Sequence, residues 1–236
     1  MAKNFLQSEG YSIVKSWLGG KGFEPFGFQL ETWEKFGKNY SGMVIAPTGF
    51  GKTYSVFLAV ITDFLNNPEN YKDGLQLLWI TPLRALAKDI AKAMTEAIDE
   101  IGLDWKVAVR NGDTPQAERV SQTKKMPEIL IITPESLQLL LAQKNNHRFF
   151  KNLKCVAVDE WHELLGSKRG VLVELALSQI ISYQKKLKIW GITATIGNLD
   201  EAMEVLIPYP IKKTKVVAKE KKKIDIIPIF PDEVEI

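Results

Sequence analysis

The chain has 236 residues, 25% charged and 45% hydrophobic, which is ordinary for a soluble globular protein. The net charge is only +3, so any nucleic-acid surface has to be a local patch rather than a global basic field. No window approaches about 18 consecutive apolar residues, and the N-terminus lacks the apolar core of a signal peptide. We therefore expect no membrane span. The single cysteine, Cys155, cannot form an intrachain disulfide, which fits a cytoplasmic location.

Apolar runs without clean polar alternation indicate strands that are covered on both faces, as in a parallel sheet. They lie at residues 43–46, 75–81, 107–110, 128–133, 155–158 and 189–193. Helical patterns separate them, at residues 55–65, 83–101, 115–122, 135–142, 171–183 and 199–206. This alternation predicts an α/β fold with a mostly parallel central sheet in a three-layer αβα arrangement, which binds ligands at the carboxyl ends of its strands.

Two further helical patterns, at residues 11–18 and 30–36, precede the first strand. Between them lies GFEPFGFQ, residues 22–29, which ends on Gln29. A glutamine side chain both donates and accepts, so Gln29 can match the two edges of adenine, and Phe23 or Phe26 can stack on the base. The alternative is a buried phenylalanine cluster beneath a surface glutamine.

The string APTGFGKT follows an apolar run and precedes a helical pattern, which is the context that a phosphate-binding loop needs. Its glycines allow a tight turn whose N–H groups, with the positive end of the next helix, form an anion cradle. We predict that Lys52 reaches the β and γ phosphates and that the Thr53 hydroxyl binds Mg²⁺. The usual pattern opens with glycine, where this chain has alanine. The candidate nucleotide-binding residues of the loop are Ala46, Pro47, Thr48, Gly49, Phe50, Gly51, Lys52 and Thr53.

Two carboxylates, Asp159 and Glu160, follow the apolar run at residues 155–158. We predict that Asp159 holds Mg²⁺, which prefers hard oxygen ligands, and that Glu160 orients or deprotonates the water that attacks the γ phosphate. The alternative is a solvated acidic strand end. Because His147 is the only histidine besides His162, a zinc site is not expected.

Thr193 and Thr195 place hydroxyl groups at the end of another apolar run. They are candidates to hydrogen-bond His162 or Asp159 and so to couple the nucleotide state to another surface. The alternative is that β-branched threonines occur there for strand propensity alone.

Seven strings, in this order, resemble the motifs of superfamily 2 helicases: GFEPFGFQ, APTGFGKT, TPLRALAKD (81–89), NGDT (111–114), TPESL (133–137), DEWH (159–162) and TAT (193–195). Ala46 agrees with that family's own version of the loop. A finer resemblance, over residues 159–177, is to the large helicase-related (Lhr) family, especially its bacterial ligase-associated DEXH-box members. It depends mostly on Trp161 and on GSKRG at 166–170.

The resemblance implies a RecA-like P-loop NTPase domain of an ATP-dependent DNA motor, with DNA repair and 3′-to-5′ movement as further implications. It implies that Gln29 reads adenine and that His162, Thr193 and Thr195 link hydrolysis to strand handling. It also implies sequence-independent contacts to the phosphates and sugars of one strand. The residues that match those motifs are Arg84, Gly112, Asp113, Thr114, Thr133, Glu135 and Ser136. All of them follow strands, and helix N-termini at that edge suit phosphates.

We expect a first RecA-like domain at residues 1–210, including an N-terminal helical segment at 1–40. Residues 211–236 are lysine-rich and are predicted to be a linker or edge segment that leads to a second RecA-like domain. The motifs of that second domain, including an arginine finger, are absent from the sequence. We therefore expect the chain alone to hydrolyse ATP poorly and not to unwind nucleic acid. The alternatives are an RNA helicase, a nucleotide-regulated nucleic-acid-binding module and a metabolic phosphate-loop kinase. Lys168 and Arg169 are either another strand contact or part of a solvated loop.

Overall fold

The computed structural model describes residues 5–194, 197–208 and 210–219, and it contains one seven-stranded sheet. The strand order is β3-β4-β2-β5-β6-β1-β7, and each of the six neighbouring pairs is parallel. The strands are β1 (Ser41–Ile45), β2 (Leu77–Ile80), β3 (Val107–Arg110), β4 (Ile129–Ile132), β5 (Cys155–Val158), β6 (Lys188–Thr193) and β7 (Lys213–Val217). The predicted α/β fold with a parallel central sheet is confirmed.

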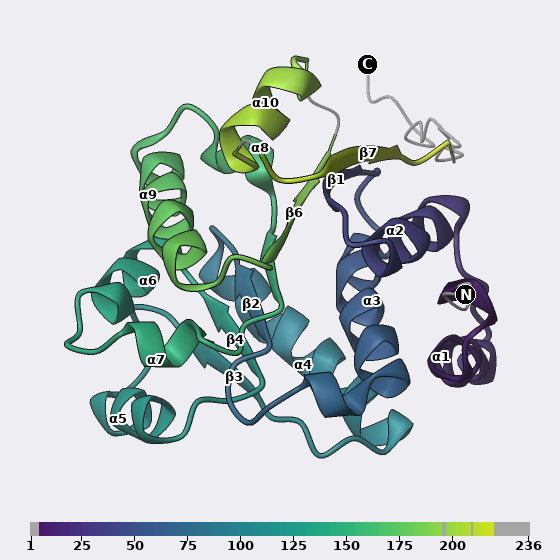
Figure 1. The fold of residues 1–236 in the computed structure, drawn as a ribbon, viewed down its shortest axis with the longest axis horizontal. Helices are drawn as coiled ribbons and strands as arrows, with labels where there is room; N and C mark the ends of the chain where they lie inside the picture. Colours follow the sequence, from purple (N-terminus) through teal and green to yellow (C-terminus); the bar gives the residue numbers. More distant parts are fainter. Residues whose placement is uncertain (1–4, 195–196, 209, 220–236) are drawn as a thin grey trace, which may run out of the picture.

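Helices cover both faces of this sheet, so the domain has three layers (Figure 1). One face packs against α1 (Glu9–Gly20), α2 (Gly27–Gly37), α3 (Lys52–Asn66) and α4 (Arg84–Ile101), with short 3-10 turns at Phe5–Gln7 and Pro68–Asn70. The other face packs against α6 (Pro134–Leu141), α7 (His147–Phe150), α8 (Trp161–Leu164), α9 (Lys168–Tyr183) and α10 (Leu199–Leu206). Helix α5 (Gln116–Lys124) lies beside the edge strand β3, where Gln122 donates to the Val109 carbonyl at 3.0 Å.

The central strands are built from apolar residues because both of their faces are covered. Strand β4 reads ILII and β5 reads CVAV, and all eight of these side chains are buried. Burying an aliphatic side chain of this size stabilises the fold by roughly 1.5–3 kcal/mol. The absence of polar alternation, from which the parallel sheet was predicted, therefore has its cause in the two helical layers.

The sheet continues beyond residue 210, where the sequence predicted the domain to end. Strand β7 pairs with β1 from Ser41↔Lys213 to Ile45↔Val217, so the start of the predicted linker is an edge strand of the sheet. Only Val216 in this strand is buried, and charged side chains on an edge strand discourage pairing with other chains. The remainder of the predicted linker, from residue 220, lies outside the described residues, as does Thr195.

Since the strands are parallel, their carboxyl ends meet at one edge of the sheet. The strings from APTGFGKT to DEWH begin directly after β1, β2, β3, β4 and β5, and Thr193 of TAT is the last residue of β6. Of the helices in the described ranges, none is both long and apolar enough to cross a membrane.

Candidate nucleotide site and nucleic-acid rim

The loop between β1 and α3 adopts the turn for which its glycines were noted. Gly49 has φ 91° and Gly51 has φ 70°, a left-handed region that favours glycine. Gly51 is the N-cap of α3, and Lys52 is the first residue of that 15-residue helix. Free backbone N–H groups at such a helix start, with the positive end of the helix dipole, suit a phosphate.

Gln29 is fixed against this loop rather than lying on the surface. Its side-chain amide donates to the Gly51 carbonyl at 3.0 Å, its side-chain carbonyl accepts from the Phe26 N–H at 2.9 Å, and the residue is 5% exposed. The Phe26 ring lies 5.4 Å from the Phe50 ring, whereas Phe23 is 64% exposed. Of the two candidate stacking residues, the structure therefore brings Phe26, and not Phe23, to the loop.

The loop and the acidic pair line one cavity of about 310 Å³. The sequence did not single out Tyr54 or the α4 residues of this cavity, although the latter follow helical spacing, which is the signal that could have identified them. The lining residues are Thr48, Gly49, Gly51, Lys52, Thr53, Tyr54, Leu86, Asp89, Ile90, Ala93, Asp159 and Glu160. A cation and two carboxylates that are far apart in sequence thus share one cavity.

Glu160 has φ 46° and ψ 47°, a left-handed conformation. Among the described non-glycine residues, only Asn39 and Asn145 also have positive φ, and asparagine tolerates this region. For a glutamate the conformation costs on the order of 1 kcal/mol, and such strain concentrates at functional sites. It places one carboxylate oxygen 3.4 Å from the Lys52 Nζ and the other 3.4 Å from the His162 Nδ1.

Asp159 is only 4% exposed, and its Oδ1 accepts the Glu160 N–H at 3.0 Å. Burial, and then the negative charge of Glu160, raise the pKa of Asp159 to about 6. A bound cation would favour the ionised form of this carboxylate. Asp159 and the Thr53 hydroxyl supply hard oxygen donors to the same cavity, so the residues present fit Mg²⁺.

A chain of polar contacts connects the acidic pair to β6. The His162 Nδ1 lies 3.1 Å from the Thr193 Oγ1, and the Thr193 carbonyl accepts the Ala46 N–H at 3.2 Å. Thr193 is fully buried. The predicted coupling residues His162 and Thr193 are therefore in contact with each other, and through Glu160 and Ala46 they join the nucleotide loop.

Among the candidate nucleic-acid residues, Arg84 and Asp113 are exposed to solvent. The Arg84 Nη1 lies 2.9 Å from the Asp113 Oδ1, and these side chains are 60% and 66% exposed. A Cβ at Gly112 would lie 2.7 Å from the Arg84 Nη2, so the guanidinium lies directly over this turn. The Thr114 hydroxyl accepts the Asn111 N–H at 2.9 Å, which holds this turn closed.

The loop after β4 contributes a second part of this rim. Thr133 and Ser136 are 3% exposed, and their hydroxyls are hydrogen-bonded to each other at 3.1 Å. The Glu135 carboxylate accepts from the Arg169 Nε at 2.5 Å and from its Nη2 at 3.1 Å. Burial alone would raise the pKa of Glu135, but the hydrogen bond from Arg169 brings that pKa below its usual value. Arg169 therefore belongs to an ion pair between α6 and α9 rather than to a solvated loop.

The sheet, the glycine loop with its lysine and the acidic strand end define a class: a RecA-like domain of the P-loop NTPases. Comparison with known proteins gives the family. The family profile of the DEAD/DEAH box helicases matches residues 27–202, and the chain belongs to this family. The predicted resemblance to superfamily 2 helicases is confirmed.

Curated relatives place the chain near the Lhr helicases, as the motif after Asp159 predicted. The ATP-dependent helicase Lhr-Core of Methanocaldococcus jannaschii is 36% identical over 207 residues, which cover 83% of this chain and 24% of that protein. Its counterpart from Saccharolobus solfataricus is 32% identical over 205 residues, or 82% of this chain and 23% of that protein. The chain thus spans about a quarter of the length of these relatives.

Solved structures agree with this placement. The helicase Lhr of Mycobacterium smegmatis, bound to single-stranded DNA and AMP-PNP, superposes with a TM-score of 0.77 at 28% identity and covers 94% of this chain and 29% of its own. The DUF1998 helicase MrfA bound to DNA gives a TM-score of 0.76 at 27% identity, with 89% and 30% covered. A hypothetical ATP-dependent RNA helicase from Sulfolobus tokodaii shares the fold, with a TM-score of 0.65 at 19% identity.

Proposed function

We propose that this chain is the ATP-binding motor domain of a longer DNA helicase or translocase, here called the parent protein, that hydrolyses ATP with Mg²⁺. The observation that carries the proposal is that Lys52 lines the same cavity as Asp159 and Glu160. A protein that only binds nucleotide has no use for a strained glutamate beside the phosphate lysine. The strained backbone of Glu160 holds its carboxylate beside Lys52, and this arrangement favours a role in hydrolysis over binding alone.

In this proposal the nucleotide phosphates lie on the start of α3. Lys52 and the free N–H groups of the loop neutralise them, and Gln29 positions the loop while its segment contacts the adenine. Asp159 and Thr53 would hold Mg²⁺, which supplies charge neutralisation to the β and γ oxygens when it is bound. Glu160 holds the attacking water and accepts its proton at the Oε atom that now faces Lys52. Through their contact with each other, His162 and Thr193 would transmit a change in the position or charge of Glu160 to β6.

One strand of DNA would cross the rim formed by the turns after β2, β3 and β4, with contacts to phosphates and sugars. Support comes from the DNA that is bound in the Lhr and MrfA structures and from the exposed Arg84 on the rim. A role in DNA repair, a cytoplasmic location and a second RecA-like domain of the parent chain belong to the same proposal. RNA is the alternative strand, because backbone contacts discriminate weakly between the two.

The experiment is ATP turnover of the parent protein with single-stranded DNA, duplex DNA or RNA of one sequence added. We expect the largest stimulation by single-stranded DNA. Larger stimulation by RNA would establish the alternative, and turnover that no polynucleotide changes would reject a nucleic-acid motor. Residues 1–236 alone should hydrolyse ATP poorly, and robust unwinding by them would contradict the need for a second domain.

A further inference from the structure

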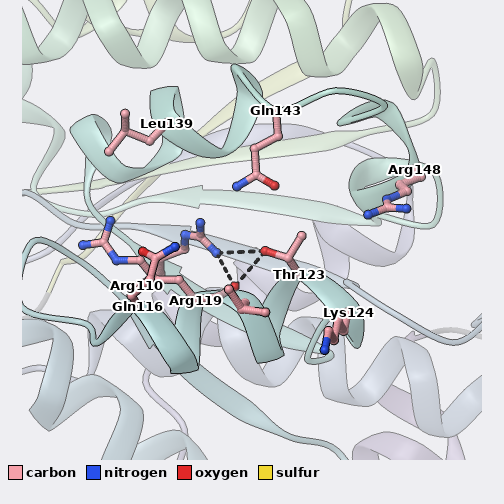
Figure 2. Close-up of a pocket in the computed structure, with 9 residues that line it drawn as sticks. Arg110, Gln116, Arg119, Thr123, Lys124, Leu139, Gln143 and Arg148 are labelled. Carbon is pink, nitrogen blue, oxygen red and sulfur yellow. Dashed lines mark hydrogen bonds between the residues drawn. The ribbon is translucent and has the colours of Figure 1, made fainter.

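A second cavity, of about 420 Å³, lies beside the edge strand β3 and shares no residue with the nucleotide cavity. Four of its lining residues are cations and none is acidic. The lining residues as a group come from the end of β3, from α5, and from α6 and α7 with the segment between them (Figure 2). The lining residues are Arg110, Gln116, Arg119, Val120, Thr123, Lys124, Leu139, Gln143 and Arg148.

Arg110 is the feature of this cavity that the fold alone does not explain. It is 3% exposed, and within the described residues no carboxylate lies within 4.0 Å of its guanidinium. Its Nη1 donates to the Arg119 carbonyl at 3.2 Å and to the Thr123 hydroxyl at 3.4 Å, as Figure 2 shows, but its Nε has no hydrogen-bond partner. Buried charges are normally paired, so a guanidinium that keeps a free donor in a cavity lined by other cations is suited to bind an anion.

The other cations of the cavity, Arg119, Lys124 and Arg148, line the same space as Arg110. Lys124 and Arg148 are exposed, and no ion pair to a carboxylate is found for either within the described part of the chain. The Arg148 guanidinium lies over the Phe149 ring at 4.9 Å, which fixes its position at the mouth. Figure 2 shows Gln143 and Arg148 across the cavity from the α5 residues. Several guanidinium groups around one space match the oxygens of a phosphate group.

Arg119 joins this cavity to the nucleic-acid rim. Its Nε donates to the Thr114 carbonyl at 2.9 Å, and its Nη2 donates to the carbonyls of Asn111 at 2.7 Å and Gly112 at 3.2 Å. These are the residues of the turn over which Arg84 lies. A strand on the rim therefore passes next to the cavity, and the half-exposed Leu139 and Val120 offer an apolar surface to a sugar or base.

We propose that this cavity binds one backbone phosphate of a nucleic-acid strand that extends past the rim. The proposal rests on the proposed function, because it needs a strand on the rim. It assigns a binding role to Arg110, Lys124 and Arg148, which none of the helicase-like motifs contains.

The first test uses the double variant Lys124→Gln/Arg148→Gln and oligo-dT strands that lengthen from about 4 to about 16 nucleotides, the range of single-strand site sizes. Both side chains are exposed, so the fold should persist. We expect unchanged affinity for the shortest strand that binds and a roughly tenfold loss for long strands. The slope of log K against log salt should fall by about 0.7, the value for one phosphate on a single strand.

The matched control is Lys185→Gln/Lys186→Gln, which removes the same charge from exposed residues before the amino end of β6, away from the carboxyl ends of the strands. It should leave both affinities unchanged. Equal losses for short and long strands, or equal losses in the control, would overturn the proposal. If the wild-type parent protein binds no strand of any length, the proposed function fails, whereas a wild-type parent that binds normally and a variant that matches it would refute the cavity alone.

The second test observes the Nε–H resonance of Arg110 by NMR, assigned with Arg110→Lys, during titration with oligo-dT, inorganic phosphate or a polyglutamate peptide at constant ionic strength. A shift with long oligo-dT that is weakened in Lys124→Gln/Arg148→Gln supports the proposal. A shift with inorganic phosphate alone would replace the strand by a free phosphate. A shift with polyglutamate alone would make the cavity a site for an acidic protein segment, and either result overturns the assignment to nucleic acid.

Discussion

The nucleotide cavity and the nucleic-acid rim each contain an ion pair, in opposite environments. Lys52 and Glu160 are 8% and 18% exposed, whereas Arg84 and Asp113 are 60% and 66% exposed. Charges act strongly where water is excluded, and salt screens them where it is not. The comparison indicates that the nucleotide site is preorganised to act on one triphosphate, while the rim is suited to contacts that form and break along a strand.

The largest effect is expected for Lys52→Ala. Removing the buried cation leaves Glu160 and Asp159 unopposed and takes the main charge from the phosphates, so ATP turnover should fall to background. The measurement is DNA-stimulated ATP hydrolysis by the parent protein. Lys185→Ala, at an exposed site away from the cavity, is the control. Undiminished turnover would reject the phosphate-loop assignment.

Glu160→Gln separates binding from chemistry in the same cavity. The amide keeps the size of the carboxylate and one of its two acceptor oxygens but cannot accept a proton at neutral pH, so hydrolysis should fall by about 10²–10⁴-fold while nucleotide binding persists. Turnover and nucleotide affinity should be measured on one preparation. If both fall together, Glu160 has a structural role only, and its left-handed backbone has another explanation.

Asp159→Asn tests the cost of burying charge. The pKa of the wild-type Asp159 carboxyl is about 6 in the folded state and 3.8 ordinarily, so the folded state holds the proton more tightly. The stabilising effect of that proton is complete below pH 3.8 and is lost as the pH rises through 6. Without divalent metal, the variant should therefore gain about 1–3 kcal/mol of unfolding free energy over wild type above pH 6, and little near pH 4. Denaturant unfolding at several pH values measures this, and a constant difference would contradict it.

The sequence was sufficient for the sheet and for the pairing across the nucleotide cavity. Runs such as ILII in β4, separated by helical patterns, indicate strands covered on both faces, and in a parallel sheet the carboxyl ends of β1 and β5 lie at the same edge. That geometry places Lys52 and Glu160 at one edge, and the strand order, in which only β6 separates β1 from β5, brings them to 3.4 Å. Local signals and the overall fold agree here, which is why the prediction succeeded.

Other features depend on contacts that no local pattern encodes. The β7 string KTKVV is polar and lysine-rich, and it becomes a strand only because β1 offers it a free edge. Phe23 and Phe26 are the same residue type in one short string, and only the packing of Phe26 against Phe50 shows which of them lies at the loop. Arg110 ends an ordinary strand pattern, and its unpaired burial arises from α5, α6 and α7 meeting beside it.

The smallest effect, and the sharpest test of the exposed rim, is expected for Asp113→Asn. An exposed ion pair is worth at most about 1 kcal/mol, so releasing Arg84 from the carboxylate should tighten binding of single-stranded DNA only about two- to fivefold. The gain should shrink as salt rises, because both the pair and the phosphate contact are screened. Asp104→Asn, an equal charge change at an exposed loop before β3, should give less. Fluorescence anisotropy at two salt concentrations measures the difference. Weaker binding by Asp113→Asn would mean that this carboxylate itself contacts the strand, as the helicase resemblance implies, and that its pairing with Arg84 is secondary.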